Sequence, residues 1–432
     1  MTPHMHRAAR RRSGVRGVAR AAALAWLCAA AAGCSDTVDR LLTATTPSRL
    51  GETAFLVPQN APLLVASAIA DFECAYGAYV VASGLASGEL YDASQTASRW
   101  SYDRREVLPA DAHYSTFGCE AIGVYTPIST ARYTTDQALQ KLGEWTDAEV
   151  PNRARLRATA ALYAGYSYLL LAEGFCTAAV NLGPELTTAQ LLDSAEARFT
   201  TALGLVTAAD STVRYGASVG RARARLGKGN TAGAASDAAT VPVSFVLNAT
   251  ADNNSGRRNN RVFAQNNASN TGVTIATPYR TLTVAGAPDP RVRVTNQNRL
   301  AGDQINQLWT QNKYASLTAS LPIATGVEAQ LILAEAQGAA QGVATLNALR
   351  ARAGVALPAL TAAEAASFQA TVYEERRREL FLQGTRWFDE RRGNLTLDPA
   401  TGTQYPKGGS YGAQRCWPLP AVERAANPNL GG

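Results

Sequence analysis

The residues best placed for chemistry lie near the C-terminus, in the stretch YEERRRELFLQGTRWFDERR. Six arginines and five acids share these twenty residues. A surface that binds phosphate groups needs positive charge that no neighbouring acid offsets. On a helix, side chains three or four residues apart lie side by side, and that spacing joins opposite charges in Glu374–Arg378, Arg386–Glu390 and Glu375–Arg378. We therefore interpret the stretch as a packing helix with a charge network and reject a nucleic-acid site.

Few other residues could support catalysis. Of three histidines, two lie within the first six residues and only His113 stands in the body of the chain. A zinc site of two or three histidines is thereby excluded, and a Ser-His-Asp triad could use only His113. LGKGN at 226–230 lacks the spacing of a phosphate-binding loop. Glu89 and Asp92 could form the acid pair of a glycosidase, but any acidic loop offers such a pair. We expect a protein without enzyme activity, cofactor or metal.

Flat aromatic side chains in irregular segments are the candidates for binding a sugar. A sugar ring has apolar C–H faces rimmed by hydroxyl groups, so it suits aromatic faces beside amides and carboxylates. The aromatic candidates are Tyr91, Trp100, Tyr102, Trp309 and Tyr314, and the polar ones are Glu89, Asp92, Gln311 and Asn312. Core packing is the alternative role for each aromatic, and it is the one we assign to Trp145, Trp387 and Trp417.

The elements that must position these residues begin after an export signal. Residues 1–33 hold six arginines and no acid, followed by the apolar run AAALAWLCAAAA. A charged segment before an apolar run too short to span a bilayer is typical of a secretory signal. Without its six charges the formal net charge falls from +7 to +1, so the remaining chain indicates no acidic partner. The small residues before Cys34 resemble a bacterial lipobox, which predicts lipidation of Cys34.

Four cysteines remain beyond the signal and Cys34. An even number in an exported protein favours two disulfides over free thiols. Four cysteines allow three connectivities, and we favour Cys74–Cys119 with Cys176–Cys416.

The rest of the chain is predicted to be mainly α. APLLVASAIADFECAYGAYVVASGLA, from Ala61, has broad apolar spacing, further helices are expected at 129–149, 327–353 and 362–392, and the segment 151–240 resembles tetratricopeptide repeats. Plain packed hairpins are the alternative to such repeats. The Asn-, Gly- and Pro-rich stretch from 241 indicates long loops with short strands. We divide the chain into a signal (1–33), a lipidated tether (34–60), an N-terminal helical region (61–240), a loop-rich ligand-side region (241–326) and a C-terminal helical region with a tail (327–432).

The C-terminal stretch also resembles a known family. The pattern ERRREL-x₃-G-x-RWFD-x-RR, followed by a tail with two prolines and an Asn-Pro-Asn, is similar to the SusD/RagB family of surface lipoproteins. ILAEAQGAAQGVATLNALRARAGV at 332–355 resembles the family's penultimate helical unit. The motif positions are Arg376, Arg377, Arg378, Glu379, Gly384, Arg386, Trp387 and Asp389. AEGFCTAAVNLG departs from the family, which often has a Tyr-Gly-Gly-Val-Pro-like turn there.

The resemblance implies a tetratricopeptide-like helical scaffold with a loop-rich second lobe. It further implies a lipid-anchored protein at the outer membrane, exposed at the cell surface. Such a protein would bind glycans or other nutrients and pass them to a SusC-like TonB-dependent transporter. The alternative is a helical-repeat scaffold of the cell envelope without a small-molecule ligand.

Overall fold

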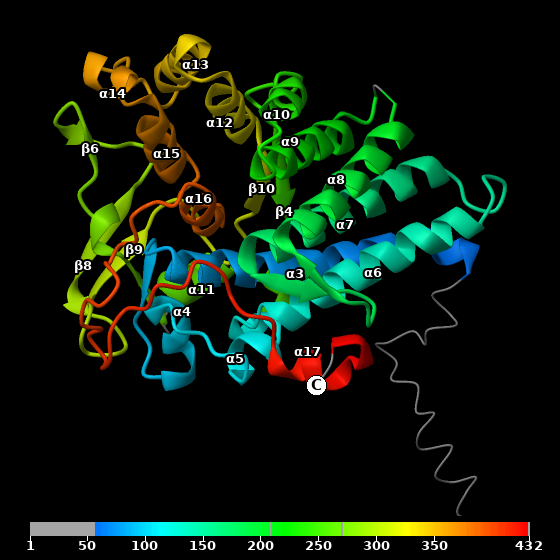
Figure 1. Cartoon of the computed structure of the whole chain (residues 1–432), viewed down its shortest axis with the longest axis horizontal. Helices are drawn as coiled ribbons and strands as arrows, with labels where there is room; N and C mark the ends of the chain where they lie inside the picture. The colour runs from blue at the N-terminus through cyan, green and yellow to red at the C-terminus, as the bar shows by residue number, and fades with distance from the viewer. Residues whose placement is uncertain (1–56, 208, 269–270, 431–432) are drawn as a thin grey trace, which may run out of the picture. The chain divides into compact units, whose positions relative to one another are not determined.

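The longest helix of the described chain, α3 (Ala61–Ala86), is a core helix. Of its 26 residues 19 are buried, because apolar and small side chains occupy nearly all of its sides. By length and a mean hydropathy of 1.4, the stretch Pro58–Ala86 could cross a membrane. Yet 72% of its most apolar window is buried inside the protein, as expected of a helix that packs against other helices (Figure 1).

The computed structural model describes residues 57–207, 209–268 and 271–430. The predicted signal, Cys34 and most of the predicted tether lie outside these residues. The described chain forms one unit from Pro58 onward.

Helices that follow one another in the chain pack side by side in the same order (Figure 1). After α3 the series comprises α6 (Tyr125–Glu144), α7 (Arg153–Gly174), α8 (Thr188–Leu205), α9 (Ser211–Gly227), α10 (Thr231–Ala238), α12 (Gly326–Gln337) and α13 (Ala339–Ala351). Each packs mainly against the helices next to it in the series, as in stacked helical hairpins. The predicted mainly α fold is confirmed.

Phe199 on α8 shows why small residues recur in this series. Its ring fills the space between α7 and α9, where Gly165 and Gly220 have no side chain to obstruct it. A Cβ atom would lie 2.6 Å from the ring at Gly165 and 2.3 Å at Gly220, closer than real contacts allow. The phenylalanine therefore joins three helices through two glycines.

Short helices and strands complete the chain. The helices are α4 (Trp100–Arg104), α5 (Ala112–Ser115), α11 (Arg261–Asn266), α14 (Ala362–Ala366), α15 (Phe368–Glu379), α16 (Arg386–Arg392) and α17 (Ala421–Ala426). The strands are β1 (Leu90–Asp92), β2 (Thr177–Ala179), β3 (Glu185–Thr187), β4 (Val246–Ala249), β5 (Val273–Ile275), β6 (Thr283–Val284), β7 (Ala287–Pro288), β8 (Val294–Leu300), β9 (Gln307–Gln311) and β10 (Leu321–Thr325). They form antiparallel pairs: β1–β5, β4–β10, β2–β3, β6–β7 and β8–β9.

The predicted helix over 362–392 is wrong in one respect, because the chain divides it into α14, α15 and α16. Leu382 and Gly384 have φ angles of 55° and 79°, which no helix accommodates. Gly384 was predicted to let another helix approach. It lies in the turn between α15 and α16 and not within a helix, but helix α3 does approach it closely: a Cβ there would lie 3.3 Å from the Tyr79 ring of α3. The predicted helix over 327–353 is likewise divided, at Gly338, whose φ is 67°.

The C-terminal tail returns to the N-terminal helices (Figure 1). Trp417 pairs with Phe175 at the end of α7, and its N–H donates to the Gly174 carbonyl at 2.9 Å. Its ring contacts Tyr79 and Tyr102 edge-on. The end of the chain thus fills the space beside α3 and α7.

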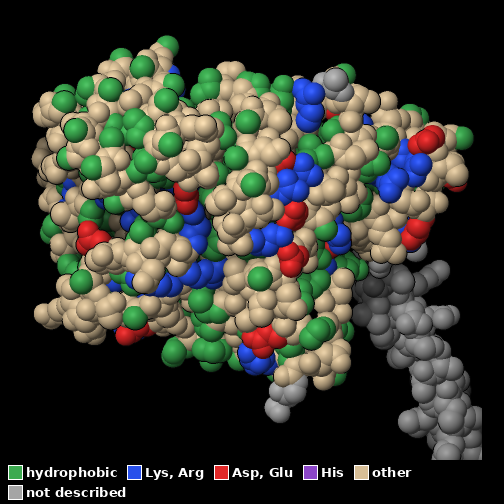
Figure 2. Space-filling model, turned by 45° about the horizontal axis from the view of Figure 1, so that its top comes forward, with side chains coloured by type: hydrophobic (Ala, Val, Ile, Leu, Met, Phe, Trp, Pro, Cys, Tyr) green, Lys and Arg blue, Asp and Glu red, His purple; other side chains and the backbone are tan. Residues whose placement is uncertain are grey.

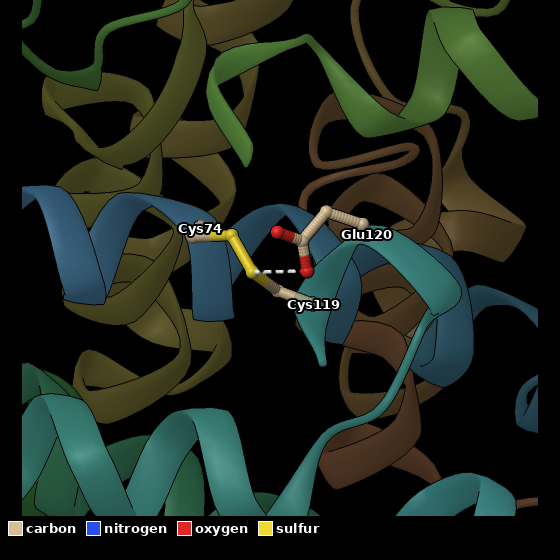
Figure 3. A group of neighbouring side chains, drawn as sticks. All are labelled: Cys74, Cys119 and Glu120. Carbon is tan, nitrogen blue, oxygen red and sulfur yellow. Dashed lines mark hydrogen bonds between the residues drawn. A yellow bond between two sulfur atoms is a disulfide. The ribbon is translucent and has the colours of Figure 1, made fainter. Parts of the chain in front are cut away.

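Two disulfides cross-link the described chain. Cys176, next to Phe175, is bonded to Cys416, next to Trp417. Cys74 on α3 is bonded to Cys119 (Figure 3). Both pairs are the ones that the sequence favoured.

Candidate functional site

The Arg-rich segment forms a buried charge network, as predicted. Arg376 donates to Asp389 at 2.8 Å, and both side chains are only 3% exposed. Arg392 bonds the other Asp389 oxygen at 2.8 Å and also Glu335. Burial alone would raise the pKa of Asp389, but Arg376 and Arg392 hold it at about 2. The segment stabilises the helices and offers no open basic surface.

One predicted ion pair is wrong. Glu375 does not bond Arg378; its two carboxylate oxygens accept from Arg291 at 2.6 Å and Arg350 at 2.7 Å. Arg378 bonds Asp289 at 2.9 Å instead. Spacing along one helix could not reveal this, because α15 packs against the loop that carries Asp289 and Arg291.

The other two predicted pairs form. Glu374 and Arg378 lie 2.7 Å apart, and Arg386 and Glu390 lie 3.0 Å apart. Figure 2 shows basic and acidic side chains next to one another at several places on one face, and a row of basic side chains in a hollow.

Two of the five aromatic candidates belong to the core. Tyr102 and Tyr314 are 1% and 4% exposed. Their hydroxyl groups donate to the carbonyls of Ile122 and Leu382, both at 2.9 Å. The expectation that they face a ligand is wrong, since burial closes both rings to it.

Glu89 and Asp92 are also inaccessible, with exposures of 1% and 0%. Glu89 accepts from the Leu382 N–H at 3.1 Å, and burial raises its pKa to about 7. Asp92 accepts from Lys407 at 2.9 Å. Neither carboxylate reaches a sugar hydroxyl. Gln311 is buried as well, whereas Asn312 is exposed.

Trp100 is half-buried, and contacts with Ser94 and Lys407 fix its ring. Its Nε1–H donates to the Ser94 carbonyl at 3.2 Å, and the Lys407 ammonium lies 5.4 Å from the ring centroid. Lys407 in turn pairs with Asp92 and with Asp303, the latter at 3.2 Å. A ligand role for Trp100 stays a prediction.

Tyr91 and Trp309, both partly exposed, are linked through Thr274. Tyr91 on β1 is opposite Thr274 on β5, and the Thr274 hydroxyl accepts from the backbone N–H of Trp309 at 2.8 Å. Arg280 Cζ lies 5.7 Å from the centroid of the Trp309 ring. The structure thus connects two candidates, far apart in sequence, through Thr274 and places an arginine over one of them.

A cleft of about 640 Å³ opens beside Arg280. It is lined by 280–283, 288–290, 292–294 and Asn312, so all of it lies within the segment predicted to be loop-rich. A second cleft of about 310 Å³ shares Pro290 and Arg293 with it and reaches Lys313.

Sequence reasoning missed Arg280 and Arg293. In the part of the chain that the structure describes, no carboxylate lies within 4.0 Å of either guanidinium group. One signal was present in PYRTLTVAGAPDPRVRV, residues 278–294, which holds three arginines and a single acid. Which of the three that acid neutralises is decided only by the fold, because Asp289 bonds Arg291.

Cys74, Cys119 and Glu120 bring their ligand atoms within 4.8 Å of one another (Figure 3). Glu120 Oε2 lies 3.6 Å from the Cys119 sulfur. A metal would need thiolates, but both sulfurs are bonded to each other. This group is a disulfide beside an acid, and its donor set does not suit a metal.

Comparisons with known proteins agree with this architecture. Residues 327–429 match the model of the SusD family. A SusD superfamily protein from Bacteroides vulgatus has the same fold, with a TM-score of 0.66 at 16% identity over 86% of this chain and 98% of that one. A SusD-like carbohydrate binding protein from the same species gives 0.64 at 14% over 87% and 97%. A laminarin binding SusD-like protein gives 0.64 at 15% over 86% and 98%. A sequence search of curated proteins gives no match.

Proposed function

Because the chain belongs to the SusD/RagB family, we propose that it binds oligosaccharides at Tyr91, Trp309 and the adjoining cleft. The observation that carries the proposal is a pair of partly exposed rings linked through Thr274, with Arg280 over the Trp309 ring and beside a cleft of about 640 Å³. Small-molecule sites enclose roughly 300–1,000 Å³. Two solved structures of this fold are described as carbohydrate-binding and as laminarin-binding, which supports the assignment.

The chemistry of the site suits a sugar. Aromatic rings offer flat apolar area at a low entropy cost, and the C–H face of a pyranose packs against such a surface. Exposed Asn312 donates through Nδ2 to Thr295 Oγ1 at 2.9 Å, which orients its amide carbonyl oxygen as an acceptor for a hydroxyl group. The site performs binding and no catalysis, since Glu89 and Asp92, the acids considered for hydrolysis, are buried.

Calorimetry with a panel of soluble glycans tests this function. Trp309→Ala should weaken binding of the retained glycan about tenfold or more, as for an aromatic anchor. Trp145→Ala is the matched control, because Trp145 is also partly buried but packs against the start of α3, away from the cleft. Equal binding by both variants contradicts the placement of the site, and failure of the wild-type protein to bind any glycan contradicts the function.

The proposal includes a place in the cell and a partner. The lipobox-like sequence before Cys34 supports a lipid anchor at the outer membrane, and the family supports delivery of the ligand to a SusC-like TonB-dependent transporter. Cys34→Ala should release the protein from membranes, as measured by fractionation. Co-purification of the lipidated protein with a β-barrel transporter tests the partnership, and persistent membrane fractionation of the variant argues against the anchor.

The alternative is a scaffold of the cell envelope without a small ligand, favoured by the sequential stacking of α6 to α10. It predicts that protein partners are retained while the glycan panel gives no heat of binding. Incubation with the same glycans and analysis of the products tests for hydrolysis, which we expect to be absent.

A further inference from the structure

We propose that the cleft beside Arg280 selects anionic saccharides, whose carboxylate or sulfate groups bind Arg280 and Arg293. This inference rests on the proposed sugar-binding function and deepens it by naming the class of ligand. It is carried by three observations: two unpaired guanidinium groups in one cleft, a neutral charge network behind them, and apolar walls beside them.

Arg280 is held in place without a carboxylate. Its Nε–H donates to the Ile275 carbonyl at 2.9 Å, and its guanidinium lies over the Trp309 ring. Its two terminal amino groups bond no other described residue of the protein. A guanidinium that is fixed through Nε and one face presents its remaining N–H groups in the fork geometry that matches carboxylate and sulfate oxygens.

Arg293 stands where the two clefts meet. It lines both, and its side chain is exposed. Its backbone carbonyl accepts from the Asn312 N–H at 2.9 Å, which fixes Arg293 beside the end of β9. The described chain places no acid within 4.0 Å of its guanidinium group. An arginine that lines a cleft and lacks an acidic partner attracts anions.

The acid that lines the cleft together with these arginines is already neutralised. Asp289 lines the cleft, but it pairs with Arg291 at 2.7 Å and with Arg378 at 2.9 Å. Burial would raise its pKa, yet these arginines hold it at about 2. The continuous network contains five acids and five arginines: Asp289, Glu364, Glu374, Glu375 and Glu379 with Arg291, Arg350, Arg352, Arg377 and Arg378. Its charges cancel, so those of Arg280 and Arg293 remain.

The smaller cleft adds a further cation. Lys313 Nζ donates to the Phe381 carbonyl at 2.7 Å, and no described carboxylate lies within ion-pair distance. Burial lowers its pKa to about 8, so most of it stays charged at pH 7. Arg352 and Glu379 in the same cleft pair with each other. Both clefts therefore carry an excess of positive charge.

The walls indicate that the anion is part of a saccharide. Leu282, Pro290 and Val294 are partly exposed and give the cleft apolar surface for C–H faces. A neutral sugar would cover the two guanidinium groups without offsetting their charge, which costs free energy of desolvation. A uronate or sulfate ester replaces the lost water with charge-assisted hydrogen bonds. The same walls would give little to an inorganic anion alone.

Matched glycans that differ only in charge test the proposal. The probes are polygalacturonate and its methyl-esterified form for carboxylate, and a sulfated galactan with its desulfated form for sulfate, all measured by affinity electrophoresis and calorimetry. We expect at least one charged glycan to bind about tenfold more tightly than its neutral partner, which corresponds to about 1.4 kcal/mol of binding free energy. Raising the NaCl concentration should weaken that binding.

Three variants assign the effect to the cleft. Arg280→Gln and Arg293→Gln should each weaken binding of the charged glycan about tenfold while its neutral partner binds as before. Arg299→Gln is the matched control: Arg299 is an exposed arginine on strand β8, which begins directly after Arg293. It has no acidic partner among the described residues and lies outside both clefts. Thermal melting confirms that the variants fold.

The outcomes separate this proposal from the broader one. Equal affinity for charged and neutral glycans, or unchanged binding by Arg293→Gln, overturns the anionic assignment and leaves sugar binding intact. Binding of no glycan by the wild-type protein overturns both. Charged binding that Arg299→Gln weakens as much as Arg293→Gln places the effect in the general charge of the surface, and it also overturns the proposal.

Discussion

Glu89 links the stability of the protein to pH near neutrality. Its carboxyl group is 1% exposed, and its Oε2 has no hydrogen-bond partner among the described residues. Burial raises its pKa from 4.5 to about 7. The native state therefore holds this proton more tightly than the unfolded state, so the free energy of unfolding falls as pH rises from about 4.5 to 7.

We expect Glu89→Gln to reduce this pH dependence and to be more stable than the wild type above pH 7. The slope does not vanish, because burial also raises the pKa of Glu390 to about 8. Urea unfolding at several pH values measures the effect, with exposed Glu144→Gln as the control. A slope that Glu89→Gln leaves unchanged would show that the carboxyl group is ionised in the native state throughout this range.

Trp387 is expected to be a packing residue. It is 0% exposed, and its ring stacks on Trp417 with centroids 6.0 Å apart. Trp387→Ala should lower the free energy of unfolding by about 3–5 kcal/mol, as for a buried large aromatic, and leave glycan affinity unchanged. Chemical denaturation and calorimetry measure the two effects. An unchanged melting temperature with lost binding would show that the residue serves the ligand instead.

For single residues, the sequence predicted charge pairs within one helix but not partners that come from other parts of the fold. Glu374–Arg378 followed from spacing, whereas the bond from Glu375 to Arg291 depends on a loop that is distant in the chain. Aromatic candidates were chosen by their local sequence, which cannot distinguish a ring such as Tyr314, in the core, from one such as Trp309, at the surface.

The packing of α8 against its neighbours depends on the absence of a side chain at Gly220. Gly220→Ala would gain helix propensity, but its Cβ would meet the Phe199 ring at 2.3 Å. We expect a net loss of about 1–3 kcal/mol, the usual cost of overpacking. At Gly204, on the same helix as Phe199, an added Cβ would have no neighbour within 4 Å, so Gly204→Ala should gain about 0.5–1 kcal/mol.

Urea unfolding of both variants measures this difference. In a Phe199→Leu background the loss caused by Gly220→Ala should shrink, because the two sites share one contact. Equal gains at Gly220 and Gly204 would show that the helices separate freely.

Helix existence could be predicted better than helix ends. The stretch from Ala61 to Ala86 was predicted from its apolar spacing and forms α3. The helix predicted at 129–149 spans Tyr125–Glu144 instead. The break between α15 and α16 could not be read from a charged, helix-favouring sequence, because it depends on Leu382 binding Glu89 and Tyr314. Tertiary contacts determined that turn.

Over the whole molecule, the Cys176–Cys416 disulfide joins parts of the chain separated by 240 residues. Cys74–Cys119 spans only 45. Removing the long-range bond by Cys176→Ser with Cys416→Ser should cost about 2–5 kcal/mol. From loop-closure entropy alone, removing Cys176–Cys416 should cost about 1.5 kcal/mol more than removing Cys74–Cys119. Denaturation of the two double variants compares them, and a larger loss from the Cys74–Cys119 pair would contradict the loop argument.

The cleft is a property of the whole molecule that sequence did not predict. Arg280, Arg291 and Arg293 look alike in the chain, but only Arg291 receives acidic partners, and these come from as far away as Glu379. Whether a charge is paired depends on every group that the fold places around it. The loop-rich character of this region could be predicted; which of its charges are left over could not.

The placement of Trp417 has a consequence for biosynthesis. A ribosome releases the chain from its first residue to its last, so α3 and α7 emerge long before the tail that packs against Tyr79 and Phe175. Until roughly the last twenty residues are free, those rings lack their cover and a chaperone has an apolar surface to hold. We therefore expect the tail to pack last, since the Cys176–Cys416 bond can form only once Cys416 has been synthesised and lies beside Cys176.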